Sequence, residues 1–92
     1  MKKAILNYNI LIEKEKQPDG NYLFVAYAPA LGLSDFGKTP DKAAHSIEGA
    51  IKIYLESLRD LCQSIPQPDH EEVYVTSRKI EFDTSVNNFI FE

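Results

Sequence analysis

The sequence predicts an α+β domain of two layers, in which one long helix packs on an antiparallel sheet of three to five strands in the order β-β-β-α-β. Two apolar runs flank a Pro-Asp-Gly turn, a pattern that indicates a β-hairpin. Farther along, apolar residues recur every three or four positions, as they do in a helix with one buried face. One such helical segment occurs in the 92 residues, so we expect a single domain over 1–92.

The hairpin is expected between residues 8 and 27. Tyr8, Ile10 and Ile12 alternate with their neighbours in a half-buried strand pattern that runs into the charged residues 13–16. A turn follows at 17–21, where proline and glycine supply the backbone angles of a tight reversal. The second strand is apolar on both faces, which is typical of a strand between two layers or at a subunit contact.

A short third strand is predicted at 33–36, and the helix begins after it, with Thr39 as the N-cap and Pro40 as the first helical residue. The residues from Gly32 to Thr39 also satisfy the phosphate-loop pattern G-x-x-x-x-G-K-[ST]. A phosphate loop places its lysine in the first turn of a helix, whereas a cap at Thr39 leaves Lys38 outside. We therefore expect no nucleotide cofactor.

The helical stripe continues to Cys62, whose place on it predicts a buried thiol. Gly49 and Ile53 interrupt the pattern, because glycine lowers helix propensity and Ile53 lies off the main stripe. An extended connector is predicted after the helix, at 64–68.

Two further apolar runs, at 73–76 and 80–82, predict one bent strand or two short ones. Residues 69–92 are therefore expected to form a C-terminal strand extension, which is too short and too strand-like for a DNA-binding module. Residues 63–92 carry two basic and six acidic side chains. An acidic surface favours a basic protein partner over DNA, which requires positive charge to neutralise its phosphates.

The composition excludes other classes. No apolar run approaches the length of a membrane span, and Asn7 and Asn9 interrupt any signal-peptide core, so a cytoplasmic location is expected. Asp41 and His45 share a helix face without a nucleophile beside them, which favours a solvated pair. No metal-ligand spacing occurs around either histidine. We predict a protein that is not an enzyme, with no catalytic, metal or cofactor site.

We expect the chain to self-associate, because it has more large apolar side chains than a single domain of this size can bury. A dimer or higher homo-oligomer would cover them. The predicted interface residues are Leu23, Val25, Tyr27, Ile53, Phe89, Ile90 and Phe91.

The order of short motifs along about two thirds of the chain resembles the HicB-type antitoxin domain. These motifs are Tyr8 to Lys14, Asp19 to Tyr22, Ala26 to Gly32, Gly37-Lys38-Thr39, Ala43-Ala44, Ile47, Ala50-Ile51, Tyr54-Leu55 and Ile65-Pro66-Gln67-Pro68.

The resemblance implies a partial ribonuclease H-like fold without its carboxylate catalytic set. It also implies binding to a small basic HicA-like ribonuclease toxin whose active site the domain covers. Two departures stand out: the loop after Pro29 lacks the family's second proline, and no DNA-binding module follows the helix. The alternative is a stand-alone homo-oligomeric domain that binds a ligand or assembles without a toxin.

Overall fold

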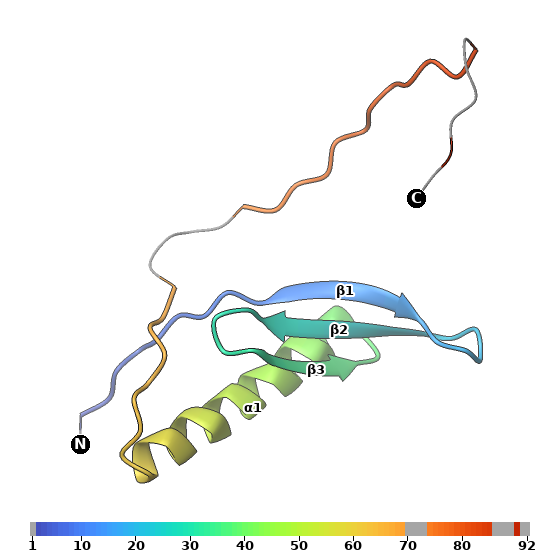
Figure 1. Cartoon of the computed structure of the whole chain (residues 1–92). Helices are drawn as coiled ribbons and strands as arrows, with labels where there is room; N and C mark the ends of the chain where they lie inside the picture. The colour runs from blue at the N-terminus through green and yellow to red at the C-terminus, as the bar shows by residue number, and fades with distance from the viewer. Residues whose placement is uncertain (1, 70–73, 86–89, 91–92) are drawn as a thin grey trace.

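The computed structural model describes residues 2–69, 74–85 and 90. Its folded part is a three-stranded sheet with one helix lying across one face (Figure 1). The elements are β1 (Leu11–Lys16), β2 (Tyr22–Ala28), β3 (Leu33–Gly37) and α1 (Pro40–Asp60). The α+β class and the β-β-β-α order are confirmed.

The three strands are antiparallel neighbours in chain order. In the first pair Leu11 lies opposite Tyr27 and Lys16 opposite Tyr22. In the second pair the register runs from Phe24 opposite Gly37 to Ala28 opposite Leu33. The turn at 17–21 closes the hairpin as predicted: the Gln17 N–H donates to the Asn21 carbonyl at 2.7 Å, and the Asp19 carboxylate accepts from the Asn21 N–H at 2.9 Å.

Helix α1 begins where the local signals place it. The Thr39 hydroxyl accepts from the Lys42 N–H at 3.1 Å, and Pro40 is the first helical residue. The cap satisfies a backbone donor that the first helical turn leaves without an intrahelical partner. Lys38 therefore lies before the helix, as the sequence predicts.

The most buried part of the core between sheet and helix is made of small and β-branched residues. Ala26 and Ala28 of β2 and Ala43 and Ile47 of α1 are fully buried, and Ile51 is nearly so. The alanines allow the helix backbone to approach the sheet closely. At the end of β3 the approach is closest, because a Cβ on Gly37 would lie 2.5 Å from the Ala43 amide nitrogen.

After α1 the chain returns along the segment that precedes β1. The Asp69 N–H donates to the Asn7 carbonyl at 2.8 Å, and the Asp69 carboxylate accepts from the Asn9 N–H at 2.7 Å. In a pair of parallel strands, the N–H and the carbonyl of one residue bond to the two residues that flank its partner. Here Asp69 makes the second of these bonds with its side-chain carboxylate in place of its backbone carbonyl. The Tyr8 hydroxyl adds a bond to the Pro66 carbonyl at 2.7 Å.

Two sequence predictions about strands need correction. The first strand lies at Leu11–Lys16 rather than around residues 8–12, because pairing extends outward from the hairpin turn and includes the charged residues 13–16. The expected C-terminal strand is not formed in 74–85, where the described residues are exposed and extend away from the sheet (Figure 1). The radius of gyration, 18.6 Å, exceeds the ~13 Å of a compact 100-residue domain for this reason.

The prediction for Cys62 is also wrong. Helix α1 ends at Asp60, and the Cys62 N–H donates to the Arg59 carbonyl at 3.0 Å within a turn. Cys62 itself has a positive φ of 56°. The turn takes its side chain off the helical stripe, so the thiol is exposed instead of buried.

Candidate functional site: the open face of the sheet

The sheet has one side that α1 does not cover. Side chains alternate between the two sides of a strand, and Ala26 and Ala28 lie in the core under the helix. Leu23, Val25 and Tyr27 therefore lie on the opposite side, which we call the open face. With their cross-strand neighbours, the residues of the open face are Leu11, Glu13, Glu15, Leu23, Val25, Tyr27, Ser34 and Phe36.

The centre of the open face is apolar. Leu11 is 40% exposed, Tyr27 43% and Phe36 60%, while Val25 between them is half-buried. Leu11, Glu13, Val25 and Tyr27 line a shallow hollow of about 170 Å³. Large apolar side chains gathered on one exposed face are typical of interaction surfaces.

The two margins of the open face differ in charge. Glu13 and Glu15 lie along β1, opposite Val25 and Leu23. Lys38 lies at the other margin, just beyond the end of β3. Lys38 and Leu23 line a larger hollow of about 750 Å³, whose other walls come from the hairpin turn and Tyr22.

The edges of the sheet are protected against strand addition. Strand β1 presents the alternating charges of residues 13–16, all exposed, and charged edge strands resist pairing with another chain. On β3 the Asp35 carboxylate accepts from the Phe36 N–H at 2.8 Å, which occupies a donor that an added strand would use. Strand addition is therefore disfavoured at both edges.

The structure separates the predicted interface residues. Leu23, Val25 and Tyr27 share the open face, whereas Ile53 lies on α1, outside the core, and is 67% exposed. Ile90 is exposed, and the predicted interface residues 89 and 91 lie outside the described residues. Sequence reasoning missed Leu11 and Phe36, because only the strand register shows that they flank Tyr27 and Val25; their alternation within each strand was the available signal.

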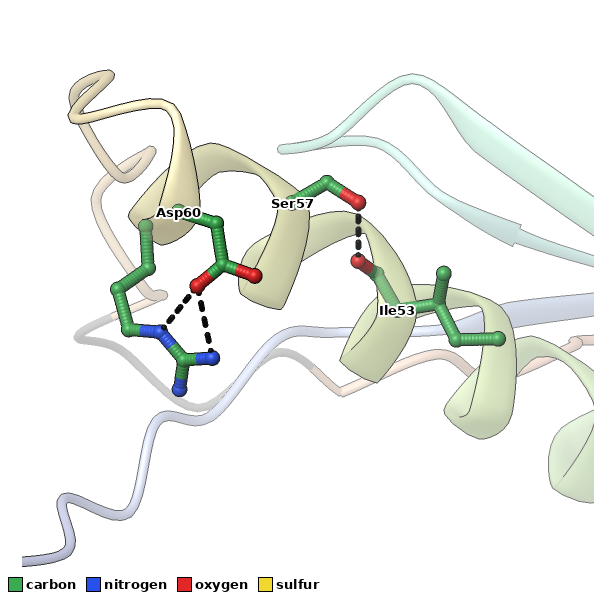
Figure 2. Close-up of polar contacts among 4 residues, drawn as sticks. Ile53, Ser57 and Asp60 are labelled. Atoms are coloured by element: carbon green, nitrogen blue, oxygen red, sulfur yellow. Dashed lines mark hydrogen bonds and ion pairs between the residues drawn. The ribbon is translucent and has the colours of Figure 1, made fainter.

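The exposed surface of α1 carries local contacts (Figure 2). The Ser57 hydroxyl donates to the Ile53 carbonyl one helical turn earlier, at 2.9 Å. Arg59 and Asp60, adjacent in sequence, form an exposed ion pair at 3.0 Å. Exposed pairs of this kind contribute little to stability. Substitutions on this surface therefore serve as controls for substitutions on the open face.

Within 2–69, 74–85 and 90, no three histidine, cysteine or acidic side chains lie close enough together to hold a metal ion. The pKa of Tyr8 is raised by burial and by the nearby Asp69 carboxylate. That of Asp83 is lowered by hydrogen bonds from the Ser85 hydroxyl and N–H. Neither group lies on the open face.

The segment 74–85 is a second exposed apolar surface. Its large apolar side chains are all mostly exposed. They are Tyr74, Val75, Ile80 and Phe82. In the described part of the chain, no helix has the length and apolar character needed to cross a membrane.

Comparison with known proteins places the chain in a family. UPF0150 protein ssr1765 of Synechocystis sp. is 41% identical over 68 residues, which cover 73% of this chain and 81% of that protein. UPF0150 protein Ta0767 of Thermoplasma acidophilum is 38% identical over 71 residues, covering 76% and 97% respectively. No protein-family model and no solved structure matches the chain. At these identities and coverages, the chain belongs to the UPF0150 family.

Proposed function

We propose that this chain is a non-catalytic protein-binding module of the HicB antitoxin type, which neutralises a small basic ribonuclease of the HicA type by covering its active site. The order of motifs along the chain supports the proposal. The UPF0150 relatives align over 68 and 71 residues, in keeping with one small shared domain, although their names state no activity.

The observation that carries the proposal is the extended segment 74–85. Its exposed Val75 and Ile80 are side chains that a folded domain normally buries. Residues 63–92, to which the segment belongs, have an excess of acidic over basic side chains. The segment itself carries two basic and two acidic side chains, so the acidic excess lies in the residues on either side of it. Apolar anchors flanked by acidic charge suit a basic protein surface, because charge steers the encounter and apolar burial holds the complex.

The experiment pairs the full-length chain with the product of the adjacent reading frame, where that frame encodes a small basic ribonuclease. Titration calorimetry measures binding, and cleavage of an RNA substrate measures inhibition. The double variant Val75→Asp, Ile80→Asp should bind at least about tenfold more weakly, because it places charge where apolar side chains would be buried. Ile53→Asp makes the same kind of change on the exposed surface of α1 and should bind as the wild type does.

Three results would count against the proposal: a toxin that the wild type does not bind, a toxin that still cleaves RNA in the complex, or no ribonuclease gene beside this one. Specific binding of the isolated chain to its own promoter DNA in a gel shift would contradict the protein-only role.

A second candidate is a stand-alone homo-oligomeric domain without a toxin. The open face favours it, because a surface of Leu11, Val25, Tyr27 and Phe36 needs a cover whether or not a toxin exists. Self-association is compatible with toxin binding, since the toxin is assigned to the segment 74–85 and self-association to the sheet; the two candidates differ in whether a toxin is bound.

A further inference from the structure

We propose that a second copy of this chain covers the open face, in a two-fold symmetric dimer whose axis runs along β2. The starting point is the mismatch between the two sides of the sheet. Toward the end of β2, Ala26 and Ala28 lie under α1 next to Phe24, and the large Val25, Tyr27 and Phe36 occupy the uncovered side. Burial of these side chains is favourable in proportion to the apolar area removed from water.

The arrangement of charge favours a second copy as the occupant. We call residues that lie opposite one another on the three strands a cross-strand row. A two-fold axis parallel to β2 places each row of one copy over the same row of the other. It also reverses the order of the strands, so that β1 of one copy lies over β3 of the other. Glu15 and Leu23 share one row. Lys38 follows Gly37, which lies opposite Phe24, and so continues that row at the far margin.

In this arrangement Glu15 of each copy lies over Lys38 of the other, and the contact is made twice. Val25 and Tyr27 of β2 lie near the axis and meet their own counterparts. Two sheets that pack face to face keep their strands within about 30° of one another and lie ~10 Å apart, so side chains from both faces fill the space between them.

A basic partner fits the open face less well. The acidic side chains lie along one margin only, and Lys38 at the other margin would repel a uniformly basic surface. Strand addition is also disfavoured, because the β1 edge is charged and the Phe36 N–H is already bonded to Asp35. In the row of Glu15 and Lys38 the surface is complementary to itself, as an isologous contact requires.

The first test compares Phe36→Asp with Ile53→Asp by sedimentation of the full-length chain at tens of micromolar. Both positions are mostly exposed in a single copy, at 60% and 67%, so neither substitution opens the core. Wild type and Ile53→Asp should sediment as dimers, while Phe36→Asp should weaken the dimer at least about 30-fold. Circular dichroism checks that each variant is folded, and Tyr27→Asp repeats the test on the central strand.

The second test examines the direction of the axis. Lys38→Glu should weaken the dimer about fivefold, because it places two carboxylates together at each margin. The double variant Glu15→Lys, Lys38→Glu should restore most of the loss, since it re-forms the pair with the charges exchanged. Failure of the double variant to restore affinity would overturn the proposed axis.

Other outcomes overturn the proposal outright. These are a wild type that is monomeric at 100 μM, or dimers that survive both Phe36→Asp and Tyr27→Asp. Loss of the dimer in the Val75→Asp, Ile80→Asp variant would show instead that residues 74–85 of another copy occupy the face. None of these measurements includes a toxin, so failure of the dimer is distinguishable from failure of the proposed function.

Discussion

At residues 25–28 of β2, the side chains on the two sides of the strand differ in size in the opposite sense to their burial. Under α1, β2 presents Ala26 and Ala28, both fully buried. On the open face the same strand presents Val25 and Tyr27, and Tyr27 is 43% exposed. Small residues on the covered side let the helix lie close to the sheet, whereas large residues on the uncovered side gain from burial only when another molecule arrives. The strand is therefore apolar on both sides for two different reasons.

The largest expected difference in the free energy of unfolding is between a substitution in the core and one on the exposed surface of α1. Ile47→Ala should lower the free energy of unfolding by about 2–5 kcal/mol, because it leaves a cavity where Ile47 is fully buried. Ile53→Ala should change it by less than about 0.5 kcal/mol, since that side chain is 67% exposed. Urea denaturation followed by circular dichroism measures both. Equal losses would mean that Ile53 is covered in the native protein.

The next comparison uses adjacent residues on opposite sides of β2. Ala26→Leu should cost about 1–3 kcal/mol, because the space under α1 is filled and the helix must move outward. Val25→Leu adds one methylene on the open face and should cost less than about 1 kcal/mol. Melting curves at two protein concentrations distinguish a change in the stability of the fold from a change in self-association, because only self-association depends on concentration. A larger loss for Val25→Leu at the lower concentration would contradict the assignment of faces.

Two glycines allow a finer comparison at the helix. Gly37→Ala should destabilise by about 1–3 kcal/mol, because its Cβ would meet the Ala43 amide nitrogen at 2.5 Å and the Lys42 carbonyl carbon at 2.7 Å. Gly49→Ala, where no heavy atom lies within 4 Å of the added Cβ, should stabilise by up to about 1 kcal/mol, since alanine favours the helix. In thermal unfolding, Gly37→Ala should lower the melting temperature and Gly49→Ala should raise it. A stabilising Gly37→Ala would show that β3 and α1 are not held at this approach.

The smallest effect concerns the contact of the connector with residues 7–9. Tyr8→Phe removes the 2.7 Å bond to the Pro66 carbonyl and should cost about 1 kcal/mol. The pKa of Tyr8 is raised in the folded protein from its ordinary 10.0. The contribution of the phenol is therefore fully present below pH 10 and is lost as the pH rises through the folded pKa.

Urea titrations of wild type and Tyr8→Phe from pH 7 to pH 11 measure this difference. The gap between the two proteins should stay constant up to about pH 10 and narrow above it. A gap that widens at alkaline pH would mean that the phenolate, not the phenol, is the favoured form in the folded state.

Features with local causes could be predicted from the sequence. The hairpin turn follows from Pro18, Asp19 and Gly20, and the helix start follows from Thr39 and Pro40, because a few neighbouring residues satisfy their own backbone groups there. Helical spacing also placed Ile53 off the buried stripe, and that side chain is 67% exposed; its predicted place at an interface stays a prediction. The order β-β-β-α required nothing beyond these signals and the apolar runs between them.

Features that depend on distant partners were decided by the tertiary structure. The helix ends at Asp60, so Cys62 is exposed although its spacing fits the stripe. The first strand begins at Leu11, opposite Tyr27 near the end of β2, and Asn7 and Asn9 before it bond to Asp69. Residues 74–85 form no strand. The open face belongs to this second group. Leu11 and Phe36 become part of one surface with Val25 and Tyr27 only through the register of three strands, which no single stretch of sequence specifies.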